Sequence, residues 1–504
     1  MNTEPLSLVQ DDDLRRKNTQ HNACAPISKL PDELLSEIFL LLADLCPLKS
    51  WFTINLICER WRNVAVGTCS LWSKPPTYHH DLTVLMLERS KGADLHIHLS
   101  NIDSNATTTA IMGQVERIQS LSVMQPTELL ESFFDILRTS PHRAARLESI
   151  RIHGPEDLDG ASDLVPAISF RQLPRLCSLE LSRVKFDWEV LPLPALTNLF
   201  LEEVEPYTKI PVFQLLERLS QMSYLENLKL TSTLFSPSGL GHIPSSLTTV
   251  ALPHLSSLEI PYIDHQQLEV ILSRMKLPRL RLLQIVIEYD DYSSLKTAIS
   301  STLMNGDFGA CDVLVVTSDW LRLIPSTEDA LAAIMSVGLE ATFIHNSSYS
   351  WNVSVATKFL PDLSDKILSR VTQLVLHDMF PSDRLRHVFA SHLPCLESIA
   401  VEDLAIRPLV NLLNTHTQHV PDTSIGIPFS NLKNITFDQR KCDQETWEEV
   451  LNCFRLRRNS GAPIQRLCLN KFVWPNNGVL ASLNDLGIAV DHRVGPSYTW
   501  HAQD

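Results

Sequence analysis

Few residues of this sequence have the types and spacing that a metal site would need. The histidine pairs His79-His80 and His96-x-His98 come nearest, and each pair could in principle share a metal ion. Neither pair has a cysteine or a carboxylate at ligand spacing, so ordinary surface or linker histidines are the favoured interpretation. The sequence therefore predicts no metal site.

Catalytic motifs are also missing from the sequence. It contains no nucleophile elbow, HExxH motif, P-loop, glycine-rich dinucleotide turn or paired acidic metal motif. With 15 glycines in 504 residues, it is poor in the loops that cradle phosphates. The 10 cysteines form no CxxC pair, which is typical of reduced thiols in a cytoplasmic or nuclear protein. We expect a protein that is not an enzyme and needs no cofactor.

The composition indicates a folded, soluble protein that binds neither nucleic acids nor anionic membranes. It is 44% hydrophobic and 20% charged, with a formal net charge of -15, which disfavours disorder, nucleic-acid binding and binding to anionic membranes. The N-terminus has no apolar signal-like stretch, and no segment reaches the roughly eighteen apolar residues of a membrane span. We expect a cytoplasmic or nuclear location, or both, and protein partners.

The N-terminal segment predicts a polar arm followed by a very apolar helix. Residues 1–25 are polar, which is typical of a disordered arm. A helix is expected from Leu30 to Leu45, because Pro31 suits the first helical position and acidic residues follow it. Two apolar stripes run along it: Leu34, Ile38, Leu41 and Leu45 form one, and Leu35, Phe39 and Leu42 form the other. One flank of the helix must therefore contact something outside its own module.

A second helix is expected directly after the first. Ser50 is the predicted N-cap, and apolar residues at steps of three and four follow it: Trp51, Ile54, Cys58, Trp61 and Ala65. A module this small cannot bury two such apolar helices, so the surplus apolar surface implies a partner.

These residues resemble the F-box family in three segments that occur in the family's order. The segments are Leu30-Pro31-Asp32-Glu33, then Cys58-Glu59-Arg60-Trp61-Arg62-Asn63-Val64-Ala65, and finally Leu71-Trp72. Glu59 and the connection from Ala43 to Trp51 depart from the family's usual pattern. The alternative interpretation is a plain N-terminal helical cap on the array that follows.

The resemblance implies a small all-α bundle over residues 26–75 that docks on a Skp-type adaptor, which in turn links to a cullin scaffold. Trp61 would lie in the core of the bundle. By the same resemblance, the adaptor-binding residues would be Leu30, Pro31, Leu34, Leu35, Ile38 and Phe39.

A repeated phrase dominates the rest of the sequence. Its clearest copies are LPRLCSLEL (173–181), LPALTNLFL (193–201), LPHLSSLEI (252–260), LPRLRLLQI (277–285) and LPCLESIAV (393–401). Looser copies begin at Ile118, Leu147, Leu225, Cys311, Val371, Leu432 and Ile464, with a doubtful one at Leu339. Most spacings fall within or just above the range of leucine-rich repeats.

Each phrase predicts a short strand, and helical patterns lie between the phrases. In the copy at 173–181, Leu179 and Leu181 should point inward and Glu180 outward, with Pro174 fixing φ before the strand. The helical patterns are 127–138, 213–222, 265–275, 328–335, 383–390 and 446–458. Right-handed crossovers between parallel strands would stack these units into an α/β solenoid of horseshoe form.

This array resembles the irregular leucine-rich repeats that follow many F-boxes, especially in mushroom-type fungi. We expect a linker and the start of the array over 76–110, the solenoid over 111–490 and a tail over 491–504, with residues 481–494 forming a last helix and strand. Residues 305–365 fit the pattern least, and within them the stretch TFIHNSSYSWNVSVATKFL (342–360) suggests an insertion. The usual repeat asparagine is absent, which predicts irregular turns; in its place stand Val184, Val204, Ile263, Met379, Leu404 and Phe472.

The outward strand residues are the candidate surface for a target protein. They are Arg151, His153, Glu180, Phe200, Glu202, Lys229, Glu259, Gln284, His377, Glu402 and Asp438. Carboxylates are the commonest charge among them, which favours a lightly basic target; ordinary solvated strand residues are the alternative for any single position.

The sequence thus predicts a substrate-recognition adaptor of an SCF-type E3 ubiquitin ligase. A repeat scaffold without ligase activity is one alternative. An enzyme with an unrecognised site on the solenoid is another.

Overall fold

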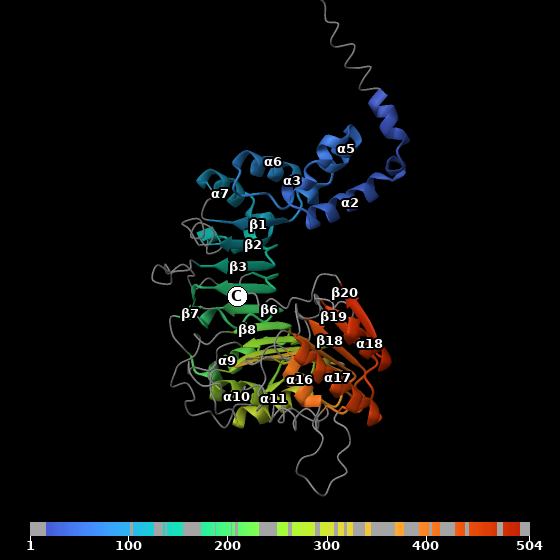
Figure 1. Cartoon of the computed structure of the whole chain (residues 1–504). Helices are drawn as coiled ribbons and strands as arrows, with labels where there is room; N and C mark the ends of the chain where they lie inside the picture. The colour runs from blue at the N-terminus through green and yellow to red at the C-terminus, as the bar shows by residue number, and fades with distance from the viewer. Residues whose placement is uncertain are drawn as a thin grey trace, which may run out of the picture. The chain divides into compact units, whose positions relative to one another are not determined.

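The structure is a computed structural model in which the chain forms two compact units, Met1–Val190 and Leu191–Asp504. Each unit combines helices with strands in a mostly parallel sheet, so the protein belongs to the mixed α/β class, as predicted (Figure 1). The described residues are 17–100, 104–124, 135–136, 139–154, 173–186, 188–202, 204–206, 210–230, 249–260, 265–287, 293–306, 311–316, 320–325, 338–343, 368–376, 393–402, 406–413, 429–438, 443–470 and 477–493.

The first unit begins with a series of short helices. Residues 17–24 are helical, whereas the sequence predicts a disordered arm over 1–25; the chain from 17 to 24 contains neither glycine nor proline to interrupt a helix. The following helices are η1 (Pro26–Lys29), α2 (Asp32–Leu45), α3 (Leu48–Trp51), α4 (Ile54–Ile57), α5 (Glu59–Gly67), η2 (Cys69–Trp72) and α6 (His80–Ser90). Pro31 is the N-cap of α2, one position before the predicted place.

The predicted second helix is wrong in its continuity, because it is broken into α3, α4 and α5. Ser50 caps nothing and lies inside α3, whose N-cap is Pro47. Cys58 has extended backbone angles, φ -156° and ψ 169°, and its Sγ accepts a hydrogen bond from the Trp61 amide at 3.5 Å. Cys58 therefore caps α5 and ends the preceding turn, even though the apolar spacing is that of one continuous helix.

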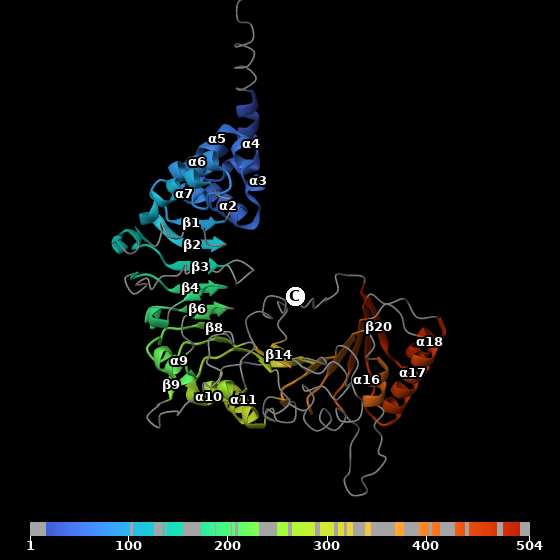
Figure 2. The ribbon, with the colours of Figure 1, turned by 90° about the vertical axis from the view of Figure 1, so that its left-hand side faces the viewer.

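The strands of the first unit form a parallel series in sequence order. They are β1 (Leu95–Leu99), β2 (Ile118–Met124), β3 (Ser149–His153) and β4 (Ser178–Ser182), and Figure 2 shows them stacked side by side. The parallel series thus starts inside segment 76–110. The remaining elements of this unit are α7 (Asn105–Met112), η3 (Val115–Arg117), η4 (Pro141–Ala144), β5 (Lys185–Phe186) and η7 (Trp188–Val190).

The second unit continues the same alternation of strands and helices. Its sheet runs in the order β6 (Asn198–Glu202), β8 (Asn227–Leu230), β10 (Ser257–Ile260), β12 (Leu282–Ile287), β15 (Gly338–Phe343), β14 (Trp320–Pro325), β13 (Cys311–Val316), β16 (Gln373–Leu376), β17 (Ser398–Glu402), β18 (Asn434–Asp438), β19 (Arg466–Asn470) and β20 (Ala489–Arg493). The short strands β9 (Val250–Ala251) and β11 (Met275–Lys276) pair separately, and β7 spans Glu205–Pro206.

The helices of the second unit are α9 (Val212–Leu219), α10 (His265–Arg274), α11 (Ser293–Asn305), α16 (Ile406–Leu413), α17 (Gln444–Asn459) and α18 (Asn477–Asp485). Of these, α9, α10 and α17 are close to predicted ranges, whereas α11 and α16 were not predicted. The predicted last helix and strand correspond to α18 and β20, and β20 extends into the segment assigned to a tail. The predicted helices at 328–335 and 383–390, and most of 127–138, lie outside the described residues.

One part of the second sheet departs from the predicted parallel order. β14 is antiparallel to both β13 and β15, while β15 pairs in parallel with β12 and β13 pairs in parallel with β16. Only residues 317–319 separate β13 from β14, and a crossover to a parallel strand needs about a dozen residues or more. The copies at Cys311 and Leu339 are therefore strands that flank an antiparallel strand, and not two successive units of the parallel series. The segment expected to be an insertion, 342–360, lies almost entirely outside the described residues.

Backbone hydrogen bonds join successive repeats just before their strands. The Ser256 and Ser257 amides both donate to the Glu226 carbonyl of the preceding repeat, at 2.7 and 3.1 Å. The same double acceptance recurs at the carbonyls of Glu148, Thr197, Ser256, Thr372, Glu397 and Lys433. Main-chain atoms thus satisfy one another at the strand starts. After the strands, at the position where an asparagine is usual, Val184 and Val204 are buried.

Candidate functional site

The N-terminal helices close around their own core of aromatic side chains. Trp72 is fully buried, and its Nε1 donates to the Ala65 carbonyl at 2.8 Å. The rings of Trp51 and Phe52 lie 5.8 and 5.9 Å from it, and the Arg89 guanidinium lies 4.4 Å from its ring centre. Trp72 at the end of the motif region therefore anchors the helices to one another.

The helix α2 divides its apolar residues sharply between core and solvent. Leu35 and Phe39 are 0% and 1% exposed, and Phe39 lies 5.2 Å from the Trp61 ring. The other stripe, hereafter the α2 stripe, faces solvent: Leu34 is 43% exposed, Ile38 42%, Leu41 62% and Leu45 83%. Contiguous exposed apolar side chains of this kind mark interaction surfaces. The stripe confirms that one flank of this helix is left over after the module has formed its core.

The predicted contact set needs a correction at two positions. Leu35 and Phe39 lie on the face of α2 that is buried in the core of the module, so a partner cannot contact them. Of the other predicted residues, Leu34, Pro31 and Ile38 are exposed and Leu30 is half-buried. The set omitted Leu41 and Leu45, although Leu41 lies three residues after Ile38 and Leu45 four residues after Leu41, which places both on the same stripe.

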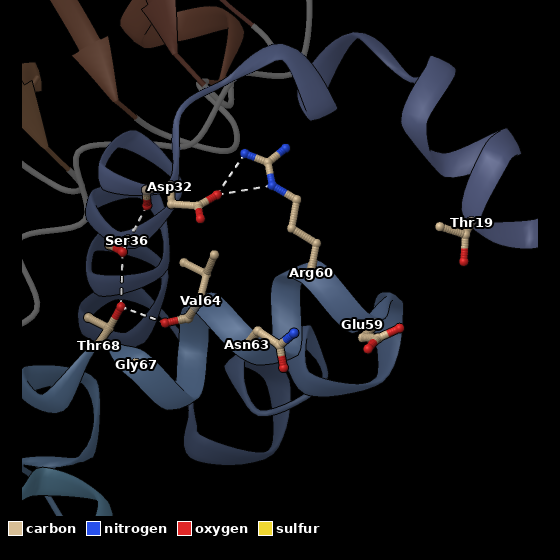
Figure 3. Close-up of a pocket in the computed structure, with 9 residues that line it drawn as sticks. All are labelled: Thr19, Asp32, Ser36, Glu59, Arg60, Asn63, Val64, Gly67 and Thr68. Carbon is tan, nitrogen blue, oxygen red and sulfur yellow. Dashed lines mark hydrogen bonds and ion pairs between the residues drawn. The ribbon is translucent and has the colours of Figure 1, made fainter.

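Arg60 fixes the chain that leads into α2. Its Nε and Nη2 donate to Asp32 Oδ1 at 3.0 and 2.7 Å, Nη1 donates to the Ser28 carbonyl at 2.6 Å, and Nη2 also donates to the Leu30 carbonyl. Figure 3 shows the guanidinium and the Asp32 carboxylate pointing toward one another between α2 and α5. Arg60 is therefore a clamp on the Leu30-Pro31 segment.

Arg60 also borders an open pocket of about 560 Å³. On its far wall, Thr68 Oγ1 donates to Ser36 Oγ at 2.9 Å, and Ser36 Oγ donates to the Asp32 carbonyl at 2.9 Å (Figure 3). The side chains of Asp32, Ser36, Arg60 and Thr68 in this pocket thus bond to each other or to the main chain. Its lining contains neither histidine nor cysteine, so it supplies no nucleophile paired with a base.

Replacement of Arg60 by glutamine is expected to lower the free energy of unfolding of the helical module by about 1–2 kcal/mol, because four charge-assisted hydrogen bonds are lost from a partly solvated site. Urea unfolding followed by tryptophan fluorescence measures this change. Lys74→Gln is the control, since it removes only the exposed pair with Asp44 at 2.6 Å and should cost less than about 1 kcal/mol. Equal effects of the two variants would contradict the clamp.

One histidine of each pair in the sequence contacts a hydroxyl group. His80 Nδ1 lies 3.2 Å from Thr107 Oγ1, and His98 Nδ1 lies 3.0 Å from Ser122 Oγ. Burial, and next the positive charge of Lys74, lower the pKa of His96. Within the described residues, no group of three or more histidine, cysteine or acidic side chains could hold a metal ion.

The predicted target-binding residues fall into rows across neighbouring strands. In the first unit Arg151 and Glu180 are in register, and Arg151 Nε lies 2.5 Å from Glu180 Oε2. In the second unit the row is Phe200, Lys229, Glu259 and Gln284, and Lys229 Nζ lies 2.8 Å from Glu202 Oε1. Much of the charge on this surface is therefore paired laterally, which weakens the case for a basic target.

The described members of that set are half-buried or exposed, and their described neighbours along the strands are buried, as the alternation predicts. His153 follows Arg151 on β3 and is half-buried. Glu402 and Asp438 are in register on β17 and β18, but their side chains lie outside the described residues, as does all of His377.

Comparisons with known proteins add little to this description. No family model matches the sequence, and no curated protein matches it significantly. Among solved structures, it is similar to a chain of the crystal structure of the Rad7 and Elc1 complex in yeast, with 13% identity and a TM-score of 0.27 over 98% of this chain and 99% of that chain. Likeness at that level shows neither the fold nor the function of this chain. None of the described helices is long and apolar enough to cross a bilayer.

Proposed function

We propose that residues 26–75 are an F-box and that the α2 stripe docks on a Skp-type adaptor protein. The observation that carries this proposal is the stripe itself, four apolar side chains that stay exposed on a helix whose opposite face fills a complete core. The three motif segments support it, since Arg60 clamps the Leu30-Pro31 segment and Trp72 anchors the bundle. Each motif residue thus has a physical task in presenting α2.

The protein is, on this proposal, the substrate-recognition adaptor of an SCF-type E3 ubiquitin ligase. The repeat units form an irregular leucine-rich-repeat solenoid of horseshoe form, whose strand face binds the target protein. Other subunits carry out ubiquitin transfer through the cullin scaffold, so this chain needs neither a catalytic residue nor a cofactor. A location in the cytoplasm or nucleus follows from such a role.

The test is calorimetric titration of the full chain with a purified Skp-type adaptor. The expected dissociation constant is about 1 μM or tighter, since a stable adaptor contact needs about 8 kcal/mol of binding free energy. No binding at adaptor concentrations well above that value would overturn the proposal.

A reconstituted ubiquitination reaction with cullin and captured targets then separates a ligase adaptor from a scaffold without ligase activity. A scaffold would bind the adaptor and the target and yield no modified target.

A further inference from the structure

The strand β1 is the first strand of the parallel series, so one of its edges faces away from β2 (Figure 2). An edge in that position presents main-chain N–H and C=O groups that can pair with a strand of another chain. Terminal units of repeat arrays therefore need a cap that the inner units, which are paired on both sides, do not need. The outer edge of β1 is the place in the first unit where such a cap must lie.

The outer edge of β1 is covered by segment 73–77, which leads from the last motif residue to α6. The His96 amide donates to the Ser73 carbonyl at 2.9 Å, and the Thr77 hydroxyl donates to the His98 carbonyl at 2.7 Å. His96 and His98 are two residues apart, so their main-chain groups point to the same edge of the strand. Ser73 and Thr77 are 7% and 5% exposed. Segment 73–77 thus bonds to the edge of β1 at both of its ends.

Two prolines occupy the middle of this segment, Pro75 and Pro76. Proline has no main-chain N–H, so neither residue can donate a hydrogen bond to a further strand. Any other residue type at these two positions would supply that donor. Segment 73–77 therefore satisfies groups of β1 on one side and offers few donors on the other, which is how natural sheets end at an edge.

The helical module holds segment 73–77 in place from both ends. Trp72, directly before the segment, is fully buried. After the segment, Thr83 Oγ1 on α6 donates to the Pro76 carbonyl, and Met86 on the same helix belongs to the core cluster that contains Trp72 and Leu35. The core beneath α2 and the cover of β1 are therefore parts of one packed structure.

We propose that segment 73–77 terminates the repeat sheet and prevents a strand of a second copy of this chain from adding to β1. The two hydrogen bonds to the edge and the two adjacent prolines carry this proposal. The helical module thereby has a second role, as the N-terminal cap of the array. The proposal does not rest on adaptor docking, because the α2 stripe takes no part in the contacts with β1.

Hydrogen exchange of the full chain tests the cover. In Thr77→Val the edge loses one of its two hydrogen bonds while the side chain keeps its shape, so the β1 amides should exchange about 5-fold faster. Thr109→Val is the matched control, because the Thr109 hydroxyl donates to the Asn105 carbonyl at 2.8 Å within α7, away from the edge. It should leave the exchange of β1 unchanged.

Sedimentation velocity of the full chain tests the two prolines. P75A/P76A restores both main-chain donors and keeps the residues that bond to β1, so we expect larger species whose share rises with protein concentration beyond that of the natural chain. P174A/P194A is the matched control, since both of these prolines are exposed in turns before other strands. It should sediment as the natural chain does. Circular dichroism confirms that each variant keeps its helices.

The proposal is wrong if Thr77→Val leaves the exchange of β1 unchanged, or if a folded P75A/P76A variant sediments as the natural chain does. If P75A/P76A loses its helical signal, Thr77→Val alone decides. Titration of Thr77→Val with the Skp-type adaptor keeps this proposal apart from the proposed function, because Thr77 lies outside the α2 stripe and adaptor affinity should stay intact there.

Discussion

Replacement of both Leu34 and Ile38 by aspartate is expected to abolish binding of a Skp-type adaptor, with a loss of at least about 100-fold in affinity. Burial of each apolar side chain would contribute about 1.5–3 kcal/mol, and an unpaired carboxylate in an apolar interface costs more. A 100-fold loss corresponds to only about 2.8 kcal/mol, so two such changes exceed it. Both residues are about 40% exposed, so the module should still fold.

Calorimetric titration with the adaptor measures the loss, and circular dichroism confirms that the helices remain. Leu456→Asp is the matched control, because Leu456 is 48% exposed on α17 in the second unit and carries the same change of chemistry at a remote place. Leu41→Asp and Leu45→Asp should each weaken binding as well if the whole α2 stripe is used. Full binding by the Leu34 and Ile38 double variant would remove the proposed docking surface.

The sequence contained both stripes of α2 but not their assignment. Leu34, Ile38 and their neighbours have the same apolar character and helical spacing as Leu35 and Phe39, so periodicity cannot tell which stripe faces the core. Which stripe is buried depends on Trp61 and Trp72. These residues lie on α5 and η2, far from α2 in the sequence, and they pack with Leu35 and Phe39 in the core. For the same reason, the adaptor-binding set implied by the family resemblance contains residues of both stripes.

The helix break at Cys58 was hidden by a similar ambiguity. Apolar residues at steps of three and four continue through it, and a cysteine is a weak acceptor that is not counted among common caps. The ion pair between Arg151 and Glu180 on neighbouring strands, by contrast, could have been predicted from the sequence. The two residues hold the same position in successive copies of the repeat, and parallel stacking brings such positions into register.

The antiparallel direction of β14 could not be predicted from the repeat pattern. The copy at Cys311 and the doubtful copy at Leu339 are strands that pair in parallel with their outer neighbours, β16 and β12, and the repeat phrase did not predict the strand between them. The informative feature was the short separation between strands, since residues 317–319 cannot form a crossover. Loop length is thus a better guide to strand direction than the side chains of the strand.

Replacement of Trp72 by alanine is expected to lower the free energy of unfolding of the helical module by about 3–5 kcal/mol, because it empties a large core site. The change also removes the hydrogen bond to the Ala65 carbonyl and the ring contacts with Trp51 and Phe52. Trp72→Phe keeps an aromatic ring and should cost less. Hydrogen exchange of the α2 and α5 amides in the full chain measures the local loss.

Hydrogen exchange should distinguish a variant that loosens α2 from a variant that only changes the residues of the docking surface. In Trp72→Ala, the α2 and α5 amides should exchange faster, and adaptor binding should weaken because α2 is no longer held in place. The Leu34 and Ile38 double variant should lose binding with unchanged exchange. Tyr224→Ala, at a ring that is 62% exposed in the second unit, should alter neither. Unchanged protection of α2 in Trp72→Ala would mean that the aromatic core does not hold α2, and the proposed origin of the exposed stripe would then be wrong.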